Sequence, residues 1–237
     1  MADLPSDRVN QNRAFLIAST DYAGPIKISE KYKSRTSKRK CWIAIFVCMV
    51  TRAVHIDAVT DLSAAAFIAC YERFIARRGH CNQMYSDNGT AFVAAHKELA
   101  RAFKIWDVPD VHEHLNKKGT KWTFMTPAAP HQGGIYEAAV KSMKYHLRRI
   151  LGAKSYTYEY LITFLVQIEA VLNSRPLYAL NDDPNDMCAL TPAHFLIGEP
   201  LILPPPISVP TQTNNSLKRM SNKEHYNVSG NTGEMNI

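Results

Sequence analysis

The sequence lacks any apolar run that could cross a membrane, and its first residues lack the hydrophobic segment of a secretory signal. The longest apolar run, Trp42 to Val50, has nine residues, whereas a membrane helix needs about 20. A run of this length is typical of a fully buried strand. We therefore expect an intracellular protein, nuclear or cytoplasmic, that has no membrane partner.

Cysteine is scarce and has no paired spacing. The odd number of cysteines indicates a reducing compartment, and the absence of a CxxC motif argues against a structural zinc site. Each cysteine lies in or beside an apolar segment, where a free thiol packs as a small hydrophobic group. The five residues are Cys41, Cys48, Cys70, Cys81 and Cys188.

Acidic residues are fewer than basic ones, and the formal net charge is +7. The segment 31–40 holds six basic side chains and no acidic one, and a second basic group follows Glu137. Clustered positive charge predicts binding to a polyanion. A solvated loop and a solvated helix face remain the alternatives, and for 31–40 so does a nuclear localisation signal. The second group consists of Lys141, Lys144, Arg148, Arg149 and Lys154.

Apolar periodicity and turn signals predict an α/β domain with a mixed sheet. We expect strands at 14–20, 41–50, 53–59, 83–86 and 122–125, and helices at 63–78, 90–104, 134–151 and 156–173. Residues 29–40 and 126–134 are predicted to be loops. The expected domain limits are a linker at 1–13, a core at 14–180, a proline-containing extension at 181–206 and a disordered tail at 207–237.

Three acidic residues stand where predicted strands end or predicted helices begin. Asp21 ends the first strand, Asp87 ends a later one, and Glu137 lies in the first turn of a helix. Sites in α/β folds collect at such positions, and carboxylates suit Mg²⁺ or Mn²⁺, including a pair of ions. Caps and surface turns are the alternative for all three residues. Asp57 and Asp61 lie at comparable strand ends and are interpreted as structural.

The helix after Glu137 is predicted to have two distinct faces. At about 100° per residue, Glu137 shares one face with a row of basic residues, which suits contact with DNA phosphates. An i to i+4 salt bridge between Glu137 and Lys141 is the alternative for one pair. The basic row is Lys141, Lys144 and Arg148, and the face predicted to pack on the core is Ala139, Met143, His146 and Ile150.

Three blocks of the sequence, DYAGP (21–25), SDNGT (86–90) and PAAPHQGGIYE (127–137), resemble the catalytic core of retroviral-type integrases. The segments FIARRG (74–79), LNSRPL (172–177) and LTPAHFLIG (190–198) extend the likeness, which is strongest to the Bel/Pao group of LTR retrotransposons. The blocks occur in the expected order, and together the likeness covers about residues 1–202.

The resemblance implies an RNase H-like fold, with a mixed five-stranded sheet flanked by helices, and a polynucleotidyl transferase activity. Such integrases process the 3′ ends of the element's DNA and join them to target DNA, use two Mg²⁺ or Mn²⁺ ions, work as homo-oligomers and take no small-molecule substrate. Matched by motif, the catalytic metal ligands are Asp21, Asp87 and Glu137. The residues expected to contact DNA are Asn88, His131, Gln132, Lys141, Lys144 and Arg148.

Two other interpretations remain open. The interval between Asp87 and Glu137 is longer than in retroviral integrases, and the sequence lacks the family's upstream zinc domain and its C-terminal DNA-binding region. A truncated or co-opted relic that binds nucleic acid without efficient catalysis is therefore one alternative. A hydrolytic RNase H-like nuclease is the other, although the proline-rich block and the basic row favour an integrase.

Overall fold

A computed structural model describes residues 9–32, 35–105, 119–124, 130–151, 156–181 and 188–201, with the backbone alone at 31–32, 35–36, 102–105 and 130–136. A five-stranded sheet in the order β3-β2-β1-β4-β5 lies at its centre. The strands β1, β2 and β3 pair antiparallel, whereas β4 and β5 run parallel to β1. Their bounds are β1 Ile17–Tyr32, β2 Arg35–Cys48, β3 Val54–Val59, β4 Gln83–Ser86 and β5 Lys121–Phe124.

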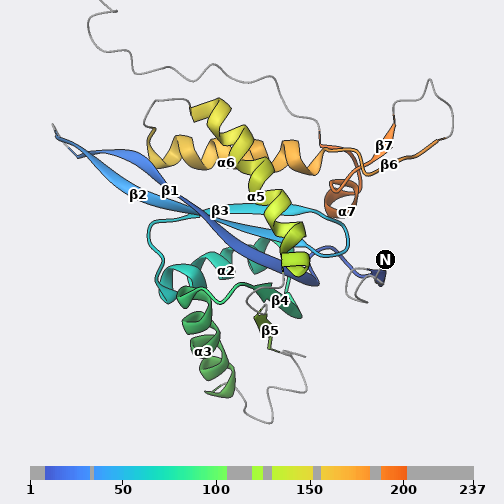
Figure 1. Cartoon of the computed structure of the whole chain (residues 1–237), viewed down its shortest axis with the longest axis horizontal. Helices are drawn as coiled ribbons and strands as arrows, with labels where there is room; N and C mark the ends of the chain where they lie inside the picture. Colours follow the sequence, from blue (N-terminus) through green and yellow to red (C-terminus); the bar gives the residue numbers. More distant parts are fainter. Residues whose placement is uncertain are drawn as a thin grey trace, which may run out of the picture. The chain divides into compact units, whose positions relative to one another are not determined.

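Helices cover both faces of the sheet (Figure 1). On one face lie α2 (Ala64–Arg78) and α3 (Thr90–Ile105), and on the other lie α5 (Pro130–Leu151) and α6 (Tyr158–Asn173). The short strands β6 (Tyr178–Ala179) and β7 (Ala189–Leu190) pair with each other, and α7 (His194–Ile197) follows them. The predicted RNase H-like fold, with its mixed five-stranded sheet, is confirmed.

Each face of the sheet has its own hydrophobic core, because neighbouring residues of a strand point to opposite faces. Under α5 and α6 the core is aliphatic, with Ile43, Ile45 and Met143 fully buried. Under α2 and α3 it is aromatic, and Phe46 stacks on Phe74 with ring centroids 4.2 Å apart. All described residues belong to one compact unit, and none of its helices is long and apolar enough to cross a membrane.

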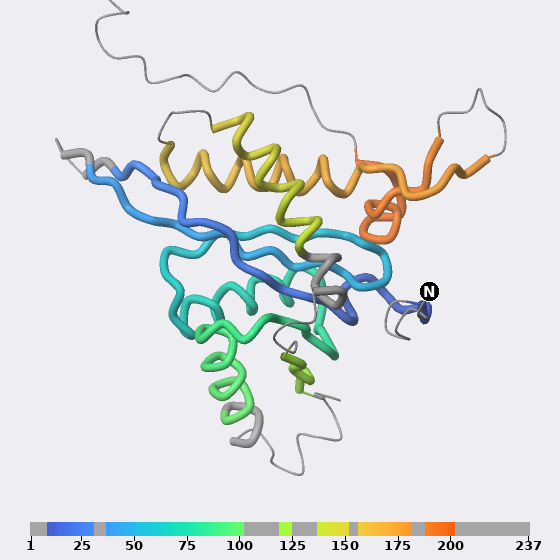
Figure 2. The backbone as a smooth tube through the Cα atoms, in the orientation of Figure 1, coloured from blue at the N-terminus to red at the C-terminus, as the bar shows by residue number. Residues whose placement is uncertain are grey.

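The first two strands are longer than predicted, and β1 continues through Gly24-Pro25, a pair of residues that is typical of a turn. Figure 2 shows β1 and β2 continuing side by side as a long hairpin, so the expected loop at 29–40 was wrong. A register shift between Ala23 and Ile26 lets the strand pass a proline, which has no N–H to donate. Glycine is favoured at position 24 because its backbone has a φ of 134°, which other residues rarely adopt, and an added Cβ would lie 3.2 Å from Cδ1 of Trp42.

Helix α5 begins earlier than predicted. It starts at Pro130, so residues 130–134 are helical and Glu137 lies two turns inside the helix, not in its first turn. Proline suits the first turn because the N–H groups there have no partner within the helix. The buried stripe is Val140, Met143 and Leu147. The predicted core face was therefore wrong for Ile150, which is 36% exposed.

The other predicted helices lie close to their expected positions. Ser63 caps α2 by accepting a hydrogen bond from the N–H of Ala66 (3.2 Å), and Gly79 ends the helix. In α6 an apolar stripe is buried against the sheet and consists of Leu161, Phe164, Leu165, Ile168 and Leu172, whereas Val171 is 38% exposed. The tail at 207–237 lies outside the described residues, so its disorder stays a prediction.

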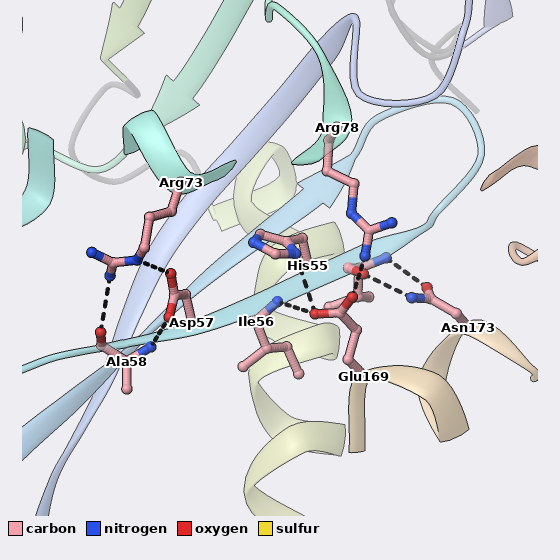
Figure 3. A network of polar contacts seen from close by, with 9 residues as sticks. His55, Ile56, Asp57, Ala58, Arg73, Arg78, Glu169 and Asn173 are labelled. Carbon is pink, nitrogen blue, oxygen red and sulfur yellow. Dashed lines mark hydrogen bonds and ion pairs between the residues drawn. The ribbon is translucent and has the colours of Figure 1, made fainter. Parts of the chain in front are cut away.

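Polar side chains cover the free edge of β3 (Figure 3). Asn173 accepts from the N–H of Val54 and donates to its carbonyl, both at 2.8 Å. Glu169 accepts from the N–H of Ile56 at 2.7 Å and forms an ion pair with Arg78. Because an open strand edge invites pairing with another chain, these contacts both attach α6 and close the edge.

Candidate active site

Asp21 lies inside β1, not at its end as predicted. Its neighbours on alternate positions, Ile17 and Ala23, pack with the core under α5 and α6, so its side chain shares that face of the sheet. Burial, followed by the charges of Asp87 and Glu137, raises the pKa of Asp21 above its ordinary value. The N–H of Tyr22 and the charge of Lys144 act in the opposite direction.

Asp87 follows the last residue of β4, at the start of the turn into α3. Its Oδ1 accepts a hydrogen bond from the N–H of Gly89 at 2.9 Å, and an added Cβ on Gly89 would lie 3.0 Å from that oxygen. The hydroxyl of Ser86 donates to the carbonyl of Asp87 and accepts from Nε1 of Trp122, each at 2.9 Å. The sheet, the turn and a buried indole therefore fix this position together.

Glu137 lies on α5, which crosses the sheet face that carries Asp21 (Figure 1). Glu137 and Asp21 line one groove of about 750 Å³. The predicted basic row lies along the same groove, and each of its members is exposed. The remaining lining residues are Val140, Lys141, Lys144, Tyr145, Arg148 and Arg149.

The structure thus brings the predicted acidic and basic residues into one region. Asp21 and Glu137 share the groove, and the charge of Asp87 reaches Asp21. In the part of the chain that the structure describes, however, no three His, Cys, Asp or Glu side chains lie close enough together to hold one metal ion. Asp87 and Glu137 are thus near enough to Asp21 to affect its pKa, but the three carboxylates do not converge on one point.

A family model described as the integrase core domain matches residues 11–130. The chain belongs to the integrase core domain family. The matched segment includes Asp21 and Asp87, whereas Glu137 and the basic row follow it. The resemblance to retroviral-type integrases is confirmed at the level of this family.

Solved integrase structures are also similar to this integrase core. One is the intasome of simian T-cell lymphotropic virus in complex with PP2A regulatory subunit B56 gamma (TM-score 0.48, 17% identity), where the match covers 90% of this chain and 66% of that one. Another is the catalytic core of BIV integrase (TM-score 0.48, 17% identity, covering 78% and 95%). A third is the HTLV-2 core in complex with magnesium, in a dimeric form (TM-score 0.47, 16% identity, covering 77% and 97%). A search of curated proteins finds no match.

The structure describes the other predicted DNA contacts of the integrase core to different extents. Asn88 is exposed in the turn after β4. His131 and Gln132 belong to the start of α5, but their side chains lie outside the described part of the structure. In the basic segment, Arg39 forms an ion pair with Glu30 at 3.1 Å across the β1–β2 hairpin, which makes part of this segment a strand pair.

Sequence reasoning missed two residues of the groove, Val140 and Tyr145. Tyr145 lines it beside the basic row, and Arg149 makes two contacts with Tyr145. The available signal was the spacing, since Tyr145 follows Lys141 by four residues and adjoins Lys144 on the same helix. An aromatic residue within a basic stripe marks a nucleic-acid surface more specifically than the charges alone.

Proposed function

We propose that this integrase core carries out metal-dependent 3′-end processing and strand transfer of DNA. Asp21, Asp87 and Glu137 are the proposed metal ligands, and the basic row of α5 is the proposed DNA contact. The observation that carries the proposal is the groove in which Asp21 and Glu137 open onto Lys141, Lys144 and Arg148. Carboxylates and cations in one groove suit a phosphodiester substrate.

The donor set fits Mg²⁺ or Mn²⁺, which prefer carboxylate oxygens to nitrogen or sulfur ligands. The raised pKa of Asp21, caused by burial and then by the charges of Asp87 and Glu137, is the effect expected of carboxylates that repel one another. Asp87 and Glu137 are exposed, so divalent ions in solvent can reach both carboxylates. Two divalent ions bound there would activate the attacking oxygen and stabilise the leaving oxygen at phosphorus.

The basic row holds the DNA in this proposal. At 1.5 Å per residue, Lys141 and Arg148 lie about 10 Å apart along α5, which equals the rise of about three nucleotides along the axis of B-DNA. Lys144 lies between them and is close enough to Asp21 to affect its pKa. The row would therefore position the phosphate backbone so that one phosphodiester reaches the carboxylates.

The source and partners follow from the sequence blocks. We place the chain in the Bel/Pao group because LNSRPL (172–177) and LTPAHFLIG (190–198) accompany the three catalytic blocks. Its DNA partners would then be the ends of an element and a target site. We also propose that the chain forms a homo-oligomer. The HTLV-2 core, which is similar to this chain, has been solved in a dimeric form.

A strand-transfer assay on a branched, disintegration-type DNA substrate tests the proposal. With Mg²⁺ or Mn²⁺ present, the chain should join the target strand and release the element end, and Asp87→Asn should abolish the product. Asp61→Asn is the matched control, since Asp61 is an exposed aspartate after β3 that accepts from the N–H of Ser63. DNA binding without metal-dependent joining would instead identify a relic.

A further inference from the structure

Tyr145 is unusual among the residues of the α5 groove. The other lining residues that the structure describes are acidic, basic or aliphatic, and Tyr145 is the one aromatic side chain among them. It is 56% exposed, although the buried Met143 and Leu147 lie two residues before and after it in the same helix. Core packing therefore does not explain the ring in this place.

Arg149 holds the tyrosine ring in position. Its Nη1 donates a hydrogen bond to the Tyr145 hydroxyl at 3.0 Å, and its guanidinium carbon lies 5.5 Å from the ring centroid. The ring of His146 meets that of Tyr145 edge to face, with centroids 5.4 Å apart. These contacts limit the rotation of the ring before any ligand arrives, so less conformational entropy is lost on binding.

We infer that Tyr145, oriented by Arg149, is a stacking platform for an unpaired nucleobase of the bound DNA. The inference rests on the proposed function only in taking the groove to be a DNA site. A flat ring that is exposed beside Lys141, Lys144 and Arg148 offers one surface for a base and another for its phosphates. Inside a duplex both faces of a base are already stacked, so the ligand is an unpaired base in a single-stranded overhang.

The inference has a direct binding test. Labelled DNA duplexes with a blunt end or a short single-stranded overhang are titrated with the full chain in buffer without divalent metal. Tyr145→Ala should weaken overhang binding by about 5- to 150-fold, the equivalent of one lost base stack. Blunt duplex should bind almost as before, and the slope of affinity against salt should be unchanged because no cation is removed.

Two further variants and one optical signal sharpen the test. Tyr145→Phe keeps the ring and should retain the overhang preference, whereas Tyr178→Ala removes an exposed tyrosine of β6 as the control. A 2-aminopurine placed in the overhang should be quenched by wild type and Tyr145→Phe but not by Tyr145→Ala. Equal losses on blunt and overhang DNA, or no loss on either, would overturn the inference.

The metal-free condition separates this inference from the proposed activity. If the chain prefers the overhang through Tyr145 but never joins strands, the stacking platform is supported and the catalytic proposal is refuted. If wild type joins strands but the Tyr145→Ala variant binds the overhang duplex as tightly as wild type does, the catalytic proposal stands and the stacking platform is refuted.

Discussion

Replacing Glu169 by alanine tests how α6 is attached to the sheet. Glu169 is 9% exposed, and its carboxylate accepts from the N–H of Ile56 and pairs with Arg78 (Figure 3). Its Oε2 also lies 3.3 Å from Nδ1 of His55, a side chain that is 2% exposed. The alanine variant removes the partner of all three groups at once.

The structure sets the size of the effect. An N–H left without an acceptor costs about 1–3 kcal/mol, and breaking a buried ion pair from one side costs about 3–5 kcal/mol. The Arg78 side chain is 21% exposed and regains some water, which lowers the second figure. We expect Glu169→Ala to lose about 3 kcal/mol of unfolding free energy, or about 6–12 °C in Tm for a chain of this length.

Urea unfolding followed by tryptophan fluorescence measures this loss. Glu159→Ala, at an exposed position of the same helix, should stay within about 0.5 kcal/mol of wild type. In a double-mutant cycle, Arg78→Ala should cost much less in the Glu169→Ala background than in wild type, because the two residues share one interaction. A Glu169→Ala loss no larger than that of Glu159→Ala, or additive costs in the cycle, would refute the reasoning.

Three further predictions follow from the charges of the structure. Although burial opposes ionisation of Glu169, contact with His55, the charge of Arg78 and the N–H of Ile56 hold its pKa below the ordinary value. The stability that ionised Glu169 contributes should therefore be complete above the ordinary pKa and be lost as pH falls through the lowered pKa. In urea titrations, the difference in unfolding free energy between wild type and Glu169→Gln should accordingly disappear in acid. The pKa of Asp21 is raised, so the folded state is destabilised once this carboxylate ionises above its ordinary pKa. Asp21→Asn should therefore gain about 0.5–2 kcal/mol of unfolding free energy at neutral pH and lose all strand transfer. A lower Tm than that of wild type would contradict this. Lys144→Ala should reduce the slope of log affinity for duplex DNA against log salt by about 1, whereas Lys97→Ala on α3 should leave it unchanged; equal slopes in both variants would remove Lys144 from the DNA contact.

Local signals predicted much of the fold. The cap at Ser63 and the stop at Gly79 give α2 within one residue, because both act on neighbouring backbone groups. Asp87 was likewise placed correctly at the end of a strand, since a short apolar segment and the Asn88-Gly89 turn enclose it. Where strand, turn and helix signals agree over a few residues, position follows from sequence.

The errors arose where distant contacts decide. Gly24-Pro25 is a strong turn signal, yet β2 pairs with β1 on both sides of it, and the register shift absorbs the proline. Glu169 was visible only as a polar residue within the apolar stripe of α6, because its partners on β3 and α2 are far away in the chain. Tyr145 could be assigned to the groove only once α5 was known to lie over β1.

Metal binding by the carboxylates is measured most directly by titrating Mn²⁺ into the full chain with a DNA end present, followed by electron paramagnetic resonance. Wild type should bind two ions, and Asp87→Asn and Glu137→Gln should each weaken binding by about tenfold or more. Asp61→Asn should bind as wild type does. If Asp87→Asn and Glu137→Gln bound Mn²⁺ as tightly as wild type, Asp21, Asp87 and Glu137 would not form the metal site.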